Sequence, residues 1–273
     1  MPSEQPANLD LGRQRLLGRT GLAVGRLGVG SSYGAPASAF EQAFEHGVNY
    51  FYWGTLRRRG MRDAIRAIAS RHREQLVVVV QSYARLGFCV TLSLERALRS
   101  LRLDHADVLL LGLHNRMPAS RILDAACALR DRGRVRHIAL SGHRRALFPE
   151  LIDDPRLDVW HVRYNAVHRK AEQEVLPALA HRAVGDRPGL VSYTATRFGD
   201  LLDARRTPPG EPTPTAVDCY RFVLSHPAVD VVLSGPADVG QMREALSALE
   251  QGPLDEAGLA WMRRVGDHIY AHR

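Results

Sequence analysis

Hydrophobic residues along the chain gather in short runs that alternate with longer amphipathic stretches. The clearest run is Ala-Asp-Val-Leu-Leu-Leu at 106–111, and polar residues flank it on both sides. Such a run is typical of a strand buried on both faces, as in a parallel sheet covered by helices. The pattern predicts eight strands, at residues 27–30, 48–53, 76–81, 106–111, 135–141, 159–164, 190–193 and 231–234.

The segments between these runs show the spacing of amphipathic helices. Thr91 and Ser120 are expected to cap the helices that begin at them, because hydroxyl side chains accept from free N–H groups at helix starts. Gly47 and Gly133 are expected to end the helices that precede them. The predicted helices cover residues 38–45, 59–70, 91–101, 120–132, 145–153, 172–183, 215–224, 238–249 and 256–270.

Strands and helices therefore alternate through eight units, and no linker interrupts them. This alternation predicts a (β/α)8 TIM barrel, preceded by a β-hairpin at 16–24 and followed by an extra C-terminal helix. A barrel of this kind occupies roughly 250 residues, so residues 1–273 are expected to form a single domain. Residues 1–14 are expected to form a loose N-terminal arm.

Composition adds little to this picture. The net charge is +8, but the basic residues are spread along the chain and Lys170 is the only lysine. An arginine-rich coding bias explains this charge, and no nucleic-acid partner is expected because no nucleic-acid motif appears. No signal peptide and no membrane-spanning run are visible, and the cysteines at 89, 127 and 219 suit buried thiols. A cytoplasmic protein without a membrane association is expected.

Several motifs occur in an order that identifies a family resemblance. They are Leu-Gly-Arg-Thr-Gly-Leu at 17–22, Arg-Leu-Gly-Val-Gly at 26–30, Gly-Val-Asn-Tyr-Phe at 47–51, Leu-Arg-Ser-Leu at 98–101 with the run at 107–111, Gly-Arg-Val-Arg-His-Ile-Ala-Leu-Ser at 133–141, Tyr-Asn at 164–165, and Arg-Phe-Val-Leu-Ser-His-Pro-Ala-Val at 221–229. From residue 16 to about 258 the chain resembles the aldo/keto reductase family. The resemblance implies a barrel that reduces carbonyls by hydride transfer from NADPH. In that family a Tyr acid is assisted by a Lys–Asp pair and a His.

The catalytic positions implied by the resemblance carry other residues here. Tyr52 stands at the Asp position, Arg57 at the Tyr position, Gln81 at the Lys position and Gly112 at the His position. A phenol needs a nearby cation to donate its proton at neutral pH. We therefore expect any reductase activity to use other groups.

The cofactor positions implied by the resemblance are partly kept. The chain has Gly142 for an Asn, His161 for a Gln, and Ala237 for a basic residue, while Asp238 places negative charge where a 2′-phosphate would bind. NADP is nevertheless the expected cofactor, bound through the loop after strand 190–193 and the helix start after strand 231–234. The expected cofactor-binding residues are Ser141, Tyr193, Arg197, Gly199, Ser234, Gly235, Gln241 and Glu244.

The strand ends supply the remaining candidates. Positions of equal parity in a strand share a face, so polar residues at the strand ends are expected to meet at the mouth of the barrel. The candidate catalytic residues are Tyr52, His114 and His161, and the expected substrate pocket adds Gln81, Tyr83, His143 and Arg163. No metal is expected, because these histidines lack the spacing of a zinc motif.

Three functions remain open at this point. The chain is a nicotinamide-dependent oxidoreductase acting on a small carbonyl compound, or an inactive barrel that binds a protein partner. The third alternative is a non-redox acid–base enzyme that uses His, Tyr and Arg side chains at the mouth.

Overall fold

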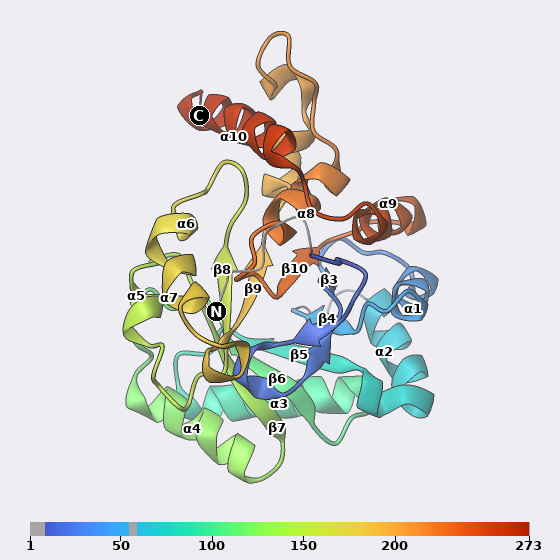
Figure 1. Cartoon of the computed structure of the whole chain (residues 1–273). Helices are drawn as coiled ribbons and strands as arrows, with labels where there is room; N and C mark the ends of the chain where they lie inside the picture. The colour runs from blue at the N-terminus through green and yellow to red at the C-terminus, as the bar shows by residue number, and fades with distance from the viewer. Residues whose placement is uncertain (1–8, 55–58, 273) are drawn as a thin grey trace.

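The fold is a closed barrel of eight parallel strands in the order β10-β3-β4-β5-β6-β7-β8-β9 (Figure 1). The computed structural model describes residues 9–54 and 59–272. The (β/α)8 prediction is thereby confirmed. The strands are β3 (Leu27–Gly30), β4 (Tyr50–Trp53), β5 (Val77–Ser82), β6 (Ala106–Leu111), β7 (Val135–Gly142), β8 (Val159–Arg163), β9 (Gly189–Tyr193) and β10 (Val231–Ser234).

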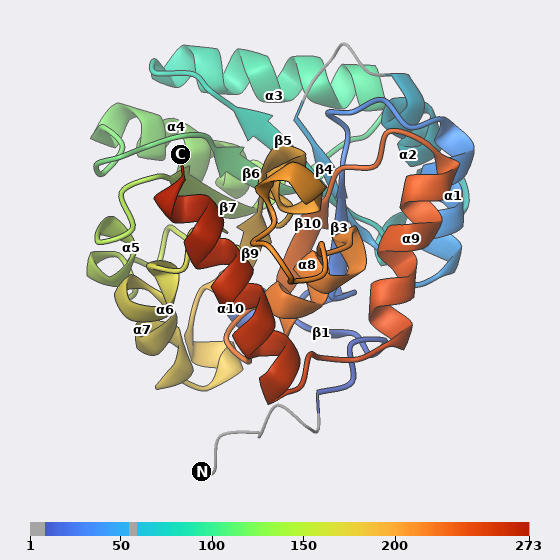
Figure 2. The same ribbon diagram turned by 90° about the horizontal axis from the view of Figure 1, so that it is seen from above.

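Helices surround the strands, as the view from above shows (Figure 2), and α10 lies beside α8 at the top of Figure 1. Short 3₁₀ turns occur in the loops, among them η5 (Arg197–Leu202) after β9. The α-helices are α1 (Ala37–Glu45), α2 (Arg59–His72), α3 (Gly87–Leu101), α4 (Ser120–Asp131), α5 (Leu147–Glu150), α6 (Ala171–Glu174), α7 (Leu176–Ala180), α8 (Ala216–Leu224), α9 (Val239–Glu250) and α10 (Glu256–Ala271).

Several predicted helix boundaries are wrong. The helix α3 begins at Gly87, so Thr91 lies inside it and does not cap it. Ser120 is the first residue of α4 and not its cap, and the residue before it, Ala119, offers no capping side chain. The helix predicted over 145–153 is only the four residues of α5. The helix predicted over 172–183 is divided into α6 and α7, because Pro177 lies at the start of α7 and proline cannot supply an N–H to a preceding turn.

A hairpin closes the end of the barrel where the strands begin, opposite to their C-terminal ends. It is formed by β1 (Arg15–Leu16) and β2 (Ala23–Val24), as the sequence predicted. Leu17 and Val24 are fully buried in one apolar cluster with barrel residues such as Val79. Gly18 has φ +49, and a Cβ there would come within 2.1 Å of the nitrogen of Gly189. The close approach of two backbones therefore requires glycine at this position.

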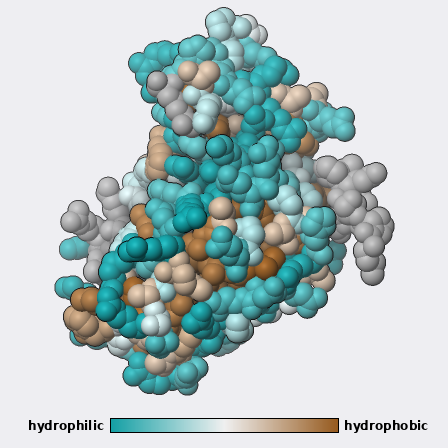
Figure 3. All heavy atoms as spheres, turned by 90° about the vertical axis from the view of Figure 1, so that its left-hand side faces the viewer, coloured by the Kyte–Doolittle hydropathy of each residue, from teal (hydrophilic) through white to brown (hydrophobic). Residues whose placement is uncertain are grey.

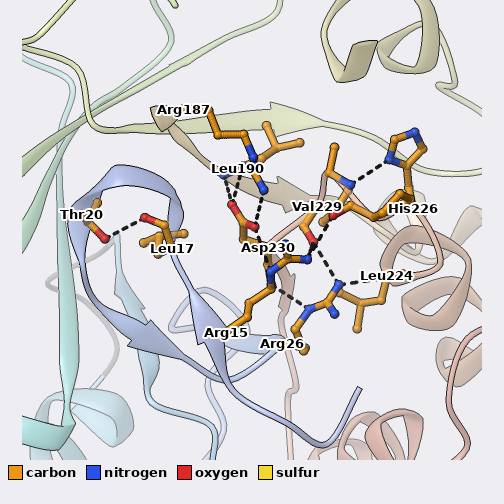
Figure 4. Close-up of polar contacts among 12 residues, drawn as sticks. Arg15, Leu17, Thr20, Arg26, Arg187, Leu190, Leu224, His226, Val229 and Asp230 are labelled. Atoms are coloured by element: carbon orange, nitrogen blue, oxygen red, sulfur yellow. Dashed lines mark hydrogen bonds and ion pairs between the residues drawn. The ribbon is translucent and has the colours of Figure 1, made fainter. Parts of the chain in front are cut away.

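A buried ion pair joins this end of the barrel to β9 and β10 (Figure 4). Asp230 is fully buried and accepts two hydrogen bonds from Arg187, at 2.9 and 2.8 Å. The N–H of Leu190 donates to the same carboxylate at 2.8 Å, and Arg15 approaches it to 3.2 Å. The negative charge of the Asp230 carboxylate is thus balanced by two arginines and a backbone N–H, as burial of a charge requires.

Packing outside the barrel strands forms the larger apolar core. Leu11 belongs to this core and is 1% exposed, so the part of the expected loose arm around it is anchored. Helix α10 approaches the β8–α6 loop so closely that a Cβ on Gly266 would lie 2.0 Å from the carbonyl oxygen of Ala166. The C-terminal helix is therefore fitted tightly to the barrel.

The outer surface is mostly hydrophilic on the side that Figure 3 shows, with hydrophobic atoms gathered across its middle. In the described part of the chain, every helix is too short or too polar to cross a bilayer. Cys219 is buried as expected, whereas Cys89 and Cys127 are only half-buried.

Candidate functional site

A cavity of about 740 Å³ opens at the C-terminal ends of the barrel strands. It extends from the centre of the barrel past η5 to the start of α9, and the lining residues come from all eight barrel strands, β3 to β10, as well as from these loops. In a TIM barrel this is the end at which active sites are built. The sequence-predicted residues that line it are Tyr52, Gln81, Tyr83, Ser141, His143, His161, Tyr193, Gly199, Ser234, Gly235, Gln241 and Glu244.

One residue that lines the cavity, His161, belongs to a hydrogen-bonded pair. The hydroxyl of Tyr50 lies 2.8 Å from Nε2 of His161, and both side chains are buried. Burial lowers the pKa of His161 to about 3, so the imidazole is neutral at pH 7. The ring of Tyr52 lies near the same imidazole, with 6.0 Å between the ring centroids and 49° between the ring planes. This pair can donate or accept hydrogen bonds, but it holds no charge at neutral pH.

Tyr52 does not have the environment of a phenolic acid. Burial, together with Tyr83 and Tyr193, raises its pKa above the ordinary value. No cation contributes to that shift, and no lysine lines the cavity among the residues that the structure describes. The hydroxyl of Tyr52 therefore stays protonated and serves as a neutral hydrogen-bonding group.

The space beside Gly112 is filled by neighbouring side chains. A Cβ on Gly112 would lie 2.4 Å from Nε2 of Gln81 and 2.9 Å from the ring of Tyr83. A larger residue at this position would require both side chains to move. Oε1 of Gln81 is buried and has no hydrogen-bond partner among the described residues. It is an acceptor that a ligand in the cavity could satisfy.

Some predicted site residues do not reach the cavity. His114 is 6% exposed, its Nε2 lies 3.3 Å from Nη1 of Arg85, and burial beside this arginine lowers its pKa to about 4. The preceding residue, Leu113, has φ +54 and lines the cavity instead. The strand alternation on which the prediction relied ends at Leu111, and the turn reverses which residue faces inward. Arg57 lies outside the described residues.

The loop after β9 carries an unusual concentration of left-handed backbone. Thr194, Arg197 and Phe198 have φ of 60°, 52° and 58°, and Gly199 follows with 98°. Such conformations in residues other than glycine store strain, which is commonly found at binding sites. Phe198 lines the cavity and is 75% exposed. Arg197, a predicted cofactor residue, is not in the lining.

Arg197 is engaged elsewhere. Its Nη1 donates to Asp200 at 2.6 Å, so its charge is neutralised within the loop. The other predicted anion site, the start of α9, is also engaged. Asp238 caps the helix by accepting from the N–H of Gln241 at 2.9 Å, and Oε1 of Gln241 accepts from the N–H of Ala237 at 2.9 Å. A carboxylate thus already occupies the positive end of this helix.

Arg145 is a residue that the sequence analysis missed. It follows β7 by three positions and interacts electrostatically with Arg163, which ends β8. Arg163 is the register partner of Tyr193 on β9, so it adjoins the cavity although it is not in the lining. Nothing in the spacing of these arginines indicates that they meet. Only the barrel register brings them together.

A metal site would need a cluster of suitable ligands. Within residues 9–54 and 59–272, no three His, Cys, Asp or Glu side chains are grouped so that they could hold a metal ion.

Solved structures that align with nearly the whole chain include aldo-keto reductases. An aldo-keto reductase from Bacillus halodurans in its holo form aligns with TM-score 0.76 and 18% identity over 93% of this chain and 96% of that chain. Its apo form gives TM-score 0.74, 19% identity, and 93% and 95% coverage. A structure assigned as a 2,5-diketo-D-gluconic acid reductase B gives TM-score 0.74, 20% identity, and 93% and 92% coverage.

Comparison by sequence finds less. No family model and no curated protein matches the chain. The likeness is therefore one of fold over nearly the whole chain, at 18–20% identity. The expected resemblance to aldo/keto reductases is confirmed in the architecture of the barrel.

Proposed function

We propose that the chain is an aldo/keto reductase-like oxidoreductase that binds a nicotinamide dinucleotide and a small carbonyl compound. The continuous cavity from the strand ends to α9 carries this proposal. Its inner part is lined by Tyr52, His161 and Tyr193, which suit a small polar substrate. Its outer part passes Gly199 and reaches Glu244, which suits an elongated ligand.

The residues fit the ring and adenosine parts of such a cofactor. Tyr193 offers an aromatic face and Ser141 a hydroxyl beside the strand ends, while Gln241 and Glu244 lie at the far end of the cavity. When bound there, the nicotinamide would supply the hydride for carbonyl reduction. The hydroxyl of Tyr52 is protonated at pH 7 and can donate a hydrogen bond to a carbonyl oxygen.

The residues do not fit a 2′-phosphate. Among the described residues that line the cavity at its α9 end there is no arginine or lysine, and Glu244 contributes an acid. Asp238 adds negative charge at the start of α9. We therefore propose NADH rather than the NADPH expected from the family resemblance, because like charges near a phosphate oppose its binding.

Thermal unfolding with each nucleotide tests this proposal. A ligand at 100 times its Kd stabilises the native state by about 2.7 kcal/mol, which for a chain of this size raises the Tm by about 5–10 °C. NADH is expected to produce such a shift, and NADPH a smaller one. Absence of a shift with either nucleotide at 5 mM would contradict the proposal and leave the binding protein and the non-redox enzyme as alternatives.

A substitution at the helix cap tests the cofactor choice. Asp238→Ser keeps a capping oxygen and removes the charge, so it is expected to strengthen NADPH binding about tenfold relative to NADH. Asp255→Ser is the matched control, because Asp255 caps α10 in the same way by accepting from Gly258 at 2.8 Å. The preference should be unchanged in this control. An equal change in both variants would count against the assigned place of the cofactor.

A further inference from the structure

Two arginine side chains near the C-terminal ends of the strands repel one another electrostatically and have little counter-charge. Arg163 forms no hydrogen bond or ion pair with any residue that the structure describes, and its Nε is buried without a partner. Nε of Arg145 is likewise buried and unpaired. The pKa of Arg145 is lowered by burial and by the charge of Arg163, so the two guanidinium groups oppose one another.

The available acid compensates for this charge only in part. Nη1 of Arg145 lies 3.8 Å from Glu174 on α6, and the side chain of Glu174 is 38% exposed while that of Arg145 is 10% exposed. A partly exposed carboxylate at that distance is a weak partner. Two guanidinium groups and one carboxylate leave one positive charge. Both arginines are half-buried, and their two Nε–H groups are buried donors without an acceptor, which is costly unless a ligand supplies one.

The arginine pair adjoins the cavity through two residues that line it. Arg163 is the register partner of Tyr193, and His143 interacts electrostatically with both arginines. The hydroxyl of Tyr193 is buried and has no hydrogen-bond partner among the described residues. Burial raises the pKa of Tyr193 to about 12 although both arginines oppose the rise, so this hydroxyl remains a donor at neutral pH. Donors and positive charge therefore converge on one side of the cavity.

We propose that Arg145, Arg163 and the hydroxyl of Tyr193 form a recognition site for the carboxylate group of a small substrate. The inference rests on the proposed function, since it names the class of carbonyl compound that the site accepts: an oxo acid. One uncompensated positive charge suits a monoanionic carboxylate better than a phosphate dianion. The planar guanidinium fork matches the geometry of a carboxylate.

Calorimetric titration without cofactor tests the site directly. The probes are 2-oxobutanoate, 3-pentanone as a carbonyl compound without a carboxylate, and inorganic phosphate, all in a low-chloride buffer. The wild type is expected to bind 2-oxobutanoate at least tenfold more tightly than 3-pentanone and more tightly than phosphate. Equal affinity for the oxo acid and the ketone would overturn the proposal. Tighter binding of phosphate would overturn the choice of a carboxylate.

Substitutions of single arginines show which side chain contributes to 2-oxobutanoate binding. Arg163→Gln is expected to weaken 2-oxobutanoate binding at least tenfold and to leave 3-pentanone binding unchanged, and Arg163→Lys is expected to restore part of the loss. Arg144→Gln is the matched control, because Arg144 is the exposed neighbour of Arg145 and is expected to have no effect. Unchanged oxo-acid affinity in Arg163→Gln, in a variant whose circular dichroism matches the wild type, would overturn the proposal.

The two proposals fail in different ways. The titration with 2-oxobutanoate requires no nucleotide, so a missing thermal shift with both NADH and NADPH would refute the oxidoreductase and leave the carboxylate site standing. A nucleotide shift without selective binding of the oxo acid would refute the carboxylate site alone.

Discussion

Removing the charge of Asp230 is expected to destabilise the protein strongly. The carboxylate is completely buried and is contacted by Arg187, Arg15 and the N–H of Leu190 (Figure 4). Asp230→Asn keeps the shape of the side chain but leaves the guanidinium of Arg187, which is 2% exposed, without its counter-charge. Breaking a buried pair in this way costs about 3–5 kcal/mol.

Urea unfolding measures the free energy and a thermal scan gives the Tm. At about 2–4 °C per kcal/mol for a chain of this size, the expected loss in Tm is about 10 °C. Asp153→Asn is the matched control, because Asp153 also receives two hydrogen bonds from one arginine, Arg182, at 2.5 and 3.1 Å. That pair is exposed, with Asp153 76% accessible, so no measurable change is expected. A decrease in Tm below 2 °C in Asp230→Asn, or equal decreases in both variants, would refute the reasoning.

Two further predictions concern packing and pH. The pKa of His161 is about 3 in the folded protein and near 6.5 when unfolded, so its contribution to stability is complete above pH 6.5 and is lost as the pH falls toward 3. Between pH 6.5 and 5 the loss is about 2 kcal/mol. Urea unfolding across this range should show a free energy of unfolding that depends less on pH in His161→Gln than in the wild type. An equal pH dependence in the two proteins would disprove the lowered pKa of His161. Gly266→Ala should lower the Tm by several degrees because its Cβ would meet the carbonyl of Ala166 at 2.0 Å. Gly185→Ala, with nothing within 4 Å, should leave the Tm unchanged, and similar values for both variants would show that the helix can shift freely.

The architecture could be predicted from the sequence because each strand is a short apolar run whose side chains alternate between the two faces of the sheet. This alternation correctly predicted that Gln81 and His161 lie at the mouth of the barrel, where both line the cavity. The prediction failed for His114 because a single left-handed residue, Leu113, changes the direction of the chain after β6. No local pattern announces such a turn, since leucine rarely adopts it.

Polar pairs between residues far apart in the chain could not be predicted from the sequence. Asp230 and Arg187 are separated by 43 positions, and neither residue type indicates its partner. Arg145 was missed for the same reason, because its closeness to Arg163 depends on the register between β7 and β8. Helix boundaries failed where capping depends on backbone geometry, as at Thr91.

The buried pair of Asp230 and Arg187 has a consequence for protein engineering. The pair stabilises the barrel at the hairpin end, whereas the ligand-facing side chains lie at the opposite end of the barrel. Randomised libraries at Tyr52, Gln81 and His143 should thus yield mostly folded proteins, since these changes leave the Asp230–Arg187 ion pair intact. The chain is therefore a suitable starting point for the engineering of new active sites, because substitutions at the cavity end of the barrel are expected to be tolerated.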